Sequence, residues 1–211
     1  IIGAGVGAAA QHSQSPYHVF TSTPGLKVVV PSTPYDAKGL IEAAVRDNDP
    51  VMFCEHKLLY DTVGEVPDDP YTLPLGIANY TREGTDITVI ALAAMVAKAN
   101  AVADRLNGEG ISVEVVDPRT TSPLDEESIL ESVESTGHVV VVDESAARCG
   151  FGHDLVALIA TKAFGSLKSA PELVTPPHTP VPFSPTLEQA WIPSESDIEA
   201  AIRRSLGLVK A

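Results

Sequence analysis

The densest group of polar side chains in the sequence is the run Gln11-His12-Ser13-Gln14-Ser15, which follows a segment of glycine and alanine. Small residues allow a backbone or a ligand to approach closely. A histidine in such a place can transfer protons, because imidazole titrates near neutral pH. The local sequence by itself favours a partly buried turn histidine held by Ser13 or Gln14, and proton transfer by His12 is the alternative.

Other chemical patterns in the sequence are weaker. The glycines at 3, 5 and 7 are too closely spaced for a dinucleotide fingerprint. Cys54 and His56 share a face of an expected strand, but no oxyanion donor accompanies them, so a cysteine hydrolase is not favoured. Cys149 precedes a helix, where an inert packed thiol is favoured. Scattered histidines also give no ligand set for catalysis by a metal: His138, His153 and His178.

The composition excludes several classes of function. The 211 residues carry a net charge of −14, from 28 acidic and 14 basic residues, which argues against binding nucleic acid or an anionic membrane surface. Two distant cysteines do not make a disulfide framework, and a cytoplasmic location fits them. The longest apolar stretch, 87–102, contains Lys98 and Asn100 and is too short to cross a bilayer, so no membrane span is expected.

Alternating strands and helices are expected to position these residues. The spacing of apolar residues predicts a short helix at 15–20 and then strand, helix and strand at 26–30, 36–46 and 51–54. A linker is expected at 61–79, which is rich in proline, glycine and aspartate. The sequence opens on an apolar pair and a glycine-rich loop, as if a strand were entered midway.

A second alternation follows the expected linker. Because its strands are apolar throughout, it predicts a parallel sheet with helices on both faces. Six prolines between 176 and 193 predict an extended arm, and a helix with a serine cap is expected at 194–206. The strands are expected at 87–91, 112–116, 138–142 and 172–175, and the helices at 95–106, 125–133 and 152–164. The predicted fold class is α/β, with two helix-covered parallel-sheet domains, the first incomplete at its N-terminus.

Several sequence segments occur in a fixed order along the chain. They run from Gln11-His12-Ser13-Gln14-Ser15 through Pro24-Gly25-Leu26-Lys27-Val28-Val29, Pro31-Ser32-Thr33-Pro34, Glu55-His56-Lys57-Leu58-Leu59-Tyr60 and Val116-Asp117-Pro118-Arg119-Thr120 to Trp191-Ile192-Pro193. In this order they resemble the beta subunits of thiamine-diphosphate-dependent 2-oxo acid and acetoin dehydrogenases. The resemblance covers essentially the whole chain. It implies that residues 1–75 are the latter part of a pyrimidine-binding domain with its linker, and that residues 76–211 are a transketolase-type C-terminal domain.

The resemblance also implies an activity and partners. Such a beta subunit joins an alpha subunit in an alpha2beta2 heterotetramer, shares thiamine diphosphate and magnesium with it, and passes an acyl group to lipoamide on a lipoyl acyltransferase core. Acetoin is the favoured substrate because of the segments 53–57 and 176–185, with pyruvate and branched-chain 2-oxo acids next. The implied role of His12 is proton transfer in the channel that the lipoyl arm enters.

The resemblance identifies only some of the site residues in this chain. The residues that hold the aminopyrimidine are expected before Ile1, so this chain by itself is expected to be inactive. A structural potassium site is implied at the backbone carbonyls of Ala44, Asp47 and Asp49. Two alternatives remain, namely a non-catalytic fragment or interaction domain, and a transketolase-like or deoxyxylulose-phosphate-synthase-like fragment. The low count of Lys and Arg speaks against the second, because sugar phosphates need basic residues.

Overall fold

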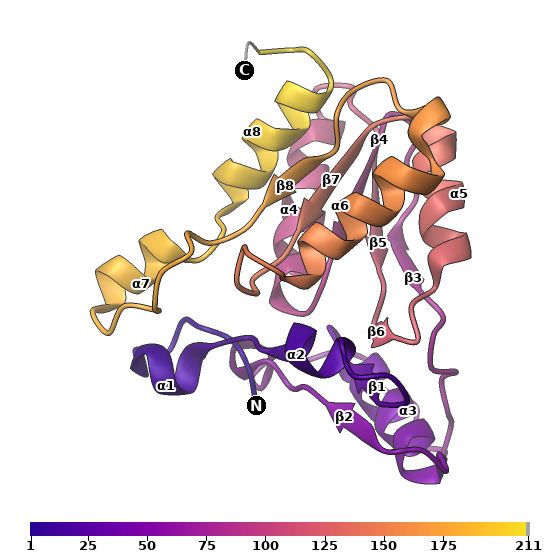
Figure 1. Ribbon diagram of the computed structural model, residues 1–211, viewed down its shortest axis with the longest axis vertical. Helices are drawn as coiled ribbons and strands as arrows, with labels where there is room; N and C mark the ends of the chain where they lie inside the picture. The colour runs from indigo at the N-terminus through magenta and orange to yellow at the C-terminus, as the bar shows by residue number, and fades with distance from the viewer. Residues whose placement is uncertain (210–211) are drawn as a thin grey trace.

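Two β-sheets organise the computed structural model, which describes residues 1–209 (Figure 1). The larger sheet has the strand order β3-β5-β4-β7-β8, and all its neighbours are parallel except β3 at one edge. Its strands are β3 (Asn79–Arg82), β4 (Ile87–Ala91), β5 (Val113–Asp117), β7 (Val139–Val142) and β8 (Glu172–Val174). Its helices are α4 (Ala94–Asn107), α5 (Glu126–Thr136), α6 (Phe151–Lys162) and α8 (Glu195–Ser205), and a 3-10 turn η2 spans Phe164–Ser166. Helix α7 (Pro185–Trp191) lies to one side of this sheet (Figure 1).

Helices cover both faces of the larger sheet, as the apolar strands predict. The four valines of β7 are all buried, and they alternate between two hydrophobic clusters. Val140 and Val142 pack with residues of α4 and α8, whereas Val139 and Val141 pack with residues of α5 and α6. Successive side chains of a strand point to opposite faces, so a run without polar residues requires cover on both.

The smaller sheet lies below the larger one in Figure 1 and has the order β2-β1-β6. Strands β1 and β2 are parallel, and β6 pairs with β1 in the antiparallel sense. Because β6 comes from the connection after β5, the later part of the chain supplies one strand of this sheet. Its elements are α1 (Ala9–Ser13), α2 (Tyr17–Thr21), β1 (Lys27–Val29), α3 (Pro34–Arg46), β2 (Val51–Phe53), the 3-10 turn η1 (Lys57–Leu59) and β6 (Thr120–Ser122).

The predicted α/β class, with two helix-covered sheets, is confirmed, but several details differ from the sequence-based expectation, and the short helix α1 is one of them. Strands β3 and β6 were not predicted, and both are antiparallel. The extended arm predicted for 176–193 is wrong in part, because it contains α7. Pro185 stands at the first turn of α7, where a fixed φ and a missing N–H cost nothing, so the prolines flank this helix rather than interrupt it.

The remaining predicted elements agree with the structure within a few residues. Helix α8 begins after Ser194, whose side chain forms the expected cap. Residues 61–78 form no helix or strand, and β3 begins at Asn79. No helix within residues 1–209 is long and apolar enough to span a membrane. Residues 210 and 211, the end of the expected second domain, lie outside the described part.

Candidate functional site

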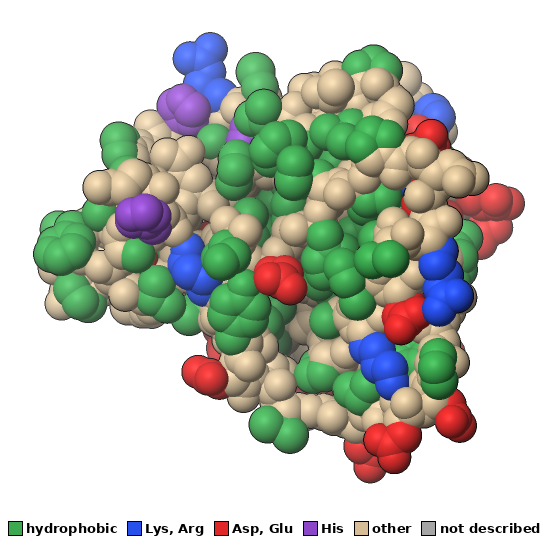
Figure 2. All heavy atoms as spheres, turned by 90° about the horizontal axis from the view of Figure 1, so that it is seen from below, with side chains coloured by type: hydrophobic (Ala, Val, Ile, Leu, Met, Phe, Trp, Pro, Cys, Tyr) green, Lys and Arg blue, Asp and Glu red, His purple; other side chains and the backbone are tan. Residues whose placement is uncertain are grey.

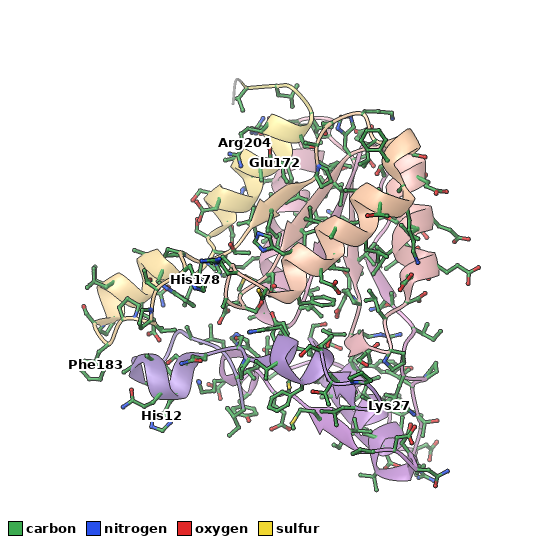
Figure 3. All side chains as sticks on the ribbon, viewed as in Figure 1. His12, Lys27, Glu172, His178, Phe183 and Arg204 are labelled. Carbon is green, nitrogen blue, oxygen red and sulfur yellow. The ribbon has the colours of Figure 1, made fainter. Side chains whose placement is uncertain are left out.

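His12 lies at the end of α1, exposed to solvent, beside a cavity of about 420 Å³. Figure 3 shows its side chain pointing away from the larger sheet. Lys57 lies in the same cavity, and its ammonium donates a hydrogen bond to the backbone carbonyl of His12. Partial burial lowers the pKa of Lys57. The cavity therefore combines an imidazole and one ammonium, and its lining is Ile1, Gln11, His12, Gln14, Pro16 and Lys57.

The glycine-rich loop that leads into α1 is held by buried carboxylates from the far end of the chain. Glu188, 1% exposed on α7, accepts hydrogen bonds from the amides of Gly5 and Gly7 at 2.9 and 2.8 Å. Glu144, which follows β7, accepts the amide of Ala4 at 2.8 Å. Glu144 satisfies the amide of the fully buried Ala4, and Glu188 satisfies two partly buried amides. Together they fix the backbone that leads to His12.

His56, which lies between β2 and η1, completes this attachment. Its Nε2 lies 3.0 Å from Glu144 Oε2, and both side chains are almost fully buried. A Cβ on Gly3 would lie 2.3 Å from the imidazole ring, and Gly3 has a φ of 94°. Only glycine tolerates both the close approach and the positive φ. Gly3 thus serves close packing onto His56, and a Cβ on Gly5 would likewise lie only 2.8 Å from the side chain of Leu58.

Cys54 and His56 do not form a nucleophile and its base. Burial raises the pKa of the Cys54 thiol to about 11, so the reactive thiolate is scarce near neutral pH. The imidazole of His56 instead contacts Glu144 and, through Nδ1, accepts the amide of Leu58 at 3.2 Å. This agrees with the sequence-based decision against a cysteine hydrolase.

Asp143 links three elements at the carboxyl end of β7. It accepts hydrogen bonds from the phenol of Tyr17 on α2, from the amide of Ser145 at 2.8 Å and from that of Gly152 on α6 at 2.7 Å. Burial, together with the neighbouring Asp143 charge, raises the pKa of Tyr17 well above its usual value. The phenol thus stays protonated and keeps its role as a donor to Asp143.

The expected potassium ligands Ala44, Asp47 and Asp49 lie on the turn that ends α3. The amide of Asp47 donates to the carbonyl of Ala44 at 3.3 Å. The ammonium of Lys27 lies 2.6 Å from an oxygen of Asp47 and 3.2 Å from one of Asp49. This contact lowers the pKa of Asp47. Figure 3 shows Lys27 and His12 on opposite sides of the lower region, so this turn is remote from His12.

Sequence analysis identified His12 but missed Asp143, Glu144 and Glu188. One signal was present, because the two acids directly follow an all-valine strand, and polar groups at the carboxyl ends of parallel strands meet at one edge of the sheet. Glu188 gave no such signal, since it reads as one exposed acid on a proline-rich arm. Its partners are more than 180 residues away in the sequence.

Family comparisons agree with this architecture. The transketolase pyrimidine-binding domain matches residues 1–62, and the transketolase C-terminal domain matches residues 76–198. The chain belongs to the transketolase family. Among solved structures it is similar to a split-gene transketolase described as an inactive beta4 tetramer, with a TM-score of 0.79 and 26% identity, over 98% of this chain and 65% of that one.

Curated relatives of known name indicate which members of this family the chain resembles. The beta subunit of acetoin:2,6-dichlorophenolindophenol oxidoreductase from Cupriavidus necator is 55% identical over 98% of this chain, and that from Bacillus subtilis is 51% identical over 97%. The pyruvate dehydrogenase E1 component subunit beta of Bacillus subtilis is 45% identical over 97%. The predicted resemblance to these beta subunits is confirmed. The chain spans 61%, 60% and 63% of the length of these three relatives.

Proposed function

We propose that the chain is part of the beta subunit of a thiamine-diphosphate-dependent dehydrogenase that cleaves acetoin and passes the acyl group to lipoamide. The observation that carries this proposal is the 55% identity to an acetoin-enzyme beta subunit over 98% of the chain. The beta subunits for pyruvate and for 2-oxoisovalerate, both from Bacillus subtilis, are 45% identical. Acetoin is therefore the first candidate substrate, and pyruvate or a related 2-oxo acid is the second.

The proposed assembly is an alpha2beta2 heterotetramer that delivers its acyl group to a lipoyl acyltransferase core in the cytoplasm. Within it, residues 1–75 and 76–211 act as the latter part of the pyrimidine-binding domain and the C-terminal domain. No group of three or more His, Cys, Asp or Glu within residues 1–209 is suited to hold a metal ion. As the family resemblance implies, the proposal assigns magnesium and the diphosphate to the alpha subunit. The cofactor, when bound, stabilises a substrate carbanion.

His12 is the proposed proton carrier of this chain. Its exposed imidazole borders a cavity that also holds the ammonium of Lys57, and this ammonium can attract an anionic group. The attachments of the glycine-rich loop to Glu144 and Glu188 hold the backbone before α1 in place. The imidazole is thus available to an arriving ligand, while the preceding backbone is fixed.

A structural potassium ion is proposed at the carbonyls of Ala44, Asp47 and Asp49. Its support is that Ala44 lies in the last turn of α3 and that Asp47 and Asp49 directly follow this helix, where their carboxylates already pair with Lys27. The role would be structural, because the turn is remote from His12 (Figure 3). Potassium would then raise the melting temperature more than sodium does at equal ionic strength.

The decisive experiment is reconstitution with an alpha subunit, after the intact mass of the beta material has been measured. Acyl transfer to lipoamide is assayed with acetoin, pyruvate and a branched-chain 2-oxo acid. A His12→Ala variant is expected to lose at least about 100-fold in rate, the scale of one proton-transfer group. His153→Ala, which changes an exposed histidine on α6, is the matched control and should keep full activity.

A non-catalytic role is the competing function, and one comparison favours it. The similar split-gene transketolase chain is described as an inactive beta4 tetramer. If this chain formed a stable homotetramer in light scattering, bound no alpha subunit and gave no acyl transfer, the dehydrogenase proposal would be wrong. A mass matching two alpha and two beta chains supports it.

A further inference from the structure

Helix α1, which carries His12, has few attachments of its own. It spans five residues, its start has no side-chain cap, and its first residue, Ala9, has a φ of 58°. Helices this short are not stable by themselves, and a positive φ is unfavourable for a residue other than glycine. Of its residues only Ser13 is buried, and Figure 1 shows α1 at one edge of the molecule. The position of His12 therefore depends on what holds α1 from outside.

One side chain from another element holds the end of α1. The ammonium of Lys57, the first residue of η1, donates a hydrogen bond to the backbone carbonyl of His12. Within residues 1–209 this is the one hydrogen bond that links α1 to another element. The last carbonyls of a helix have no partner inside it, and a cation beside them is favourable because this end of a helix carries partial negative charge. Lys57 therefore caps the residue that carries the exposed imidazole.

The backbone of Lys57 is itself fixed. Its amide donates to the carbonyl of Ile2 at 3.1 Å, and the amide of Ile2 donates to the carbonyl of Glu55 at 2.8 Å. His56, the preceding residue, is 3% exposed and contacts the buried Glu144. Burial lowers the pKa of Lys57, and nearby carboxylates oppose this shift. The ammonium thus reaches α1 from a fixed base.

We propose that Lys57 is a positioning residue, whose hydrogen bond to the carbonyl of His12 fixes the direction from which the imidazole meets an arriving ligand. This inference rests on the proposed function, in which His12 transfers protons. A displacement of about 1 Å at a reacting group can lower a rate about 100-fold. A contact that holds the backbone of His12 therefore affects the rate without touching the substrate. Lys57 itself does not exchange the proton.

Lys57→Met tests the inference, because it removes the donor and keeps a side chain of similar length. In the complex reconstituted with an alpha subunit, kcat for acyl transfer to lipoamide should fall about 10-fold, while KM for the substrate stays within about 2-fold of the wild type. Lys57→Arg, which can donate to the same carbonyl, should restore kcat to within about 3-fold. The double variant with His12→Ala should lose no more than His12→Ala alone, because Lys57 acts through His12.

The order of α1 in the purified 211-residue chain is a measurement that needs no activity. Nitrogen-15 relaxation should give order parameters of about 0.85 for residues 11–13 in the wild type and below about 0.6 in Lys57→Met. Lys168→Met is the matched control, since the ammonium of Lys168 donates to the carbonyl of Thr136 at 2.8 Å, at the end of α5. Figure 1 shows α5 on the opposite side of the molecule from α1. This control should change neither kcat nor the order of residues 11–13.

Four results would overturn the inference. They are unchanged order at residues 11–13 in Lys57→Met, unchanged kcat despite lost order, a raised KM with kcat intact, and a double variant that loses more than His12→Ala. The third would mean that Lys57 binds the substrate, and the fourth that it acts by a route other than His12. Failure of the proposed function appears as absent acyl transfer in the wild-type complex, whereas failure of this inference appears only in the variants.

Discussion

The two sheets differ in how completely they bury their own side chains. Every residue of β4 and β7 in the larger sheet is buried, whereas all three residues of β2 in the smaller sheet are only half-buried. Exposed large hydrophobic residues are concentrated in the first part of the chain, and Figure 2 shows hydrophobic side chains gathered on the lower face of the molecule. Nine lie in residues 1–64 and seven in residues 65–209; the nine are Ile1, Val6, Val19, Tyr35, Ile41, Val45, Leu58, Tyr60 and Val63.

This difference indicates two modes of stabilisation. The larger sheet has helices on both faces and is stabilised by apolar burial. The smaller sheet has short strands and borrows β6. It shares an apolar cluster with the larger sheet through residues such as Val28 and Val30, and it is also attached through buried polar groups, namely Asp117, Asp143, Glu144 and Glu188. The smaller region should therefore respond most to changes in polar contacts, and the larger region least.

At a fixed neutral pH, the largest effect is expected from Glu188→Ala. This change leaves the amides of Gly5 and Gly7 without their acceptors, and we expect a loss of about 3 kcal/mol in the free energy of unfolding. Hydrogen exchange should show lost protection at residues 3–7, while β4 and α4 keep theirs. Urea denaturation gives the free energy.

Two controls accompany this change. Glu188→Gln retains one acceptor oxygen and should lose about half as much. Gln189→Ala, at an exposed position of the same helix, should change the free energy of unfolding by less than about 0.5 kcal/mol. Equal loss of protection in the larger sheet would contradict the idea that the two regions are held differently.

Asp117, another buried carboxyl group, should make the stability of the folded protein depend on pH. It is fully buried at the end of β5, where it accepts from the hydroxyl of Ser32 and from the amide of Arg119 at 2.9 Å. Burial raises its pKa to about 7, against about 4 in an unfolded chain. The folded protein therefore binds the proton more tightly. The stability from this group is complete below about pH 4 and is lost as the pH rises through about 7.

The slope of this loss is at most about 1.4 kcal/mol per pH unit. Asp117→Asn keeps an acceptor for Arg119 and cannot titrate, so its stability should vary less between about pH 4 and pH 7. Denaturation at four pH values measures the difference. Asp154→Asn, at an exposed aspartate of α6, should leave the slope as it is in the wild type. An unchanged slope in Asp117→Asn would exclude Asp117 as its source.

The two regions also differ in how well their strands and helices could be predicted from the sequence. Continuous apolar strands such as β4 and β7, and the capped helix α8, have local signals, and the structure confirms them. Strand β6 has only three polar residues, and it exists because β1 offers it an edge. A pairing over such a sequence distance leaves no periodicity to detect.

The candidate site shows the same limit. His12 was identified because its neighbours form a dense polar run with a family resemblance. Glu144 contacts a residue that is 140 positions away in the sequence. The partners of Glu188 are more than 180 positions away. A buried carboxylate and a solvated one have the same sequence signature, so only the fold distinguishes them.

The smallest effect is expected in the larger region, from Ser194→Ala at the start of α8. Ser194 Oγ accepts the amide of Asp197 at 3.2 Å, and Asp197 in return accepts the amide of Ser194 at 2.9 Å. Losing the cap should cost about 1 kcal/mol. The helix should remain, because Ile198 and Ile202 are fully buried against the sheet. Ser194→Asn, which retains a capping oxygen, should restore most of the stability in urea denaturation. A loss as large as that of Glu188→Ala would show that the larger region depends on polar contacts as much as the smaller one does.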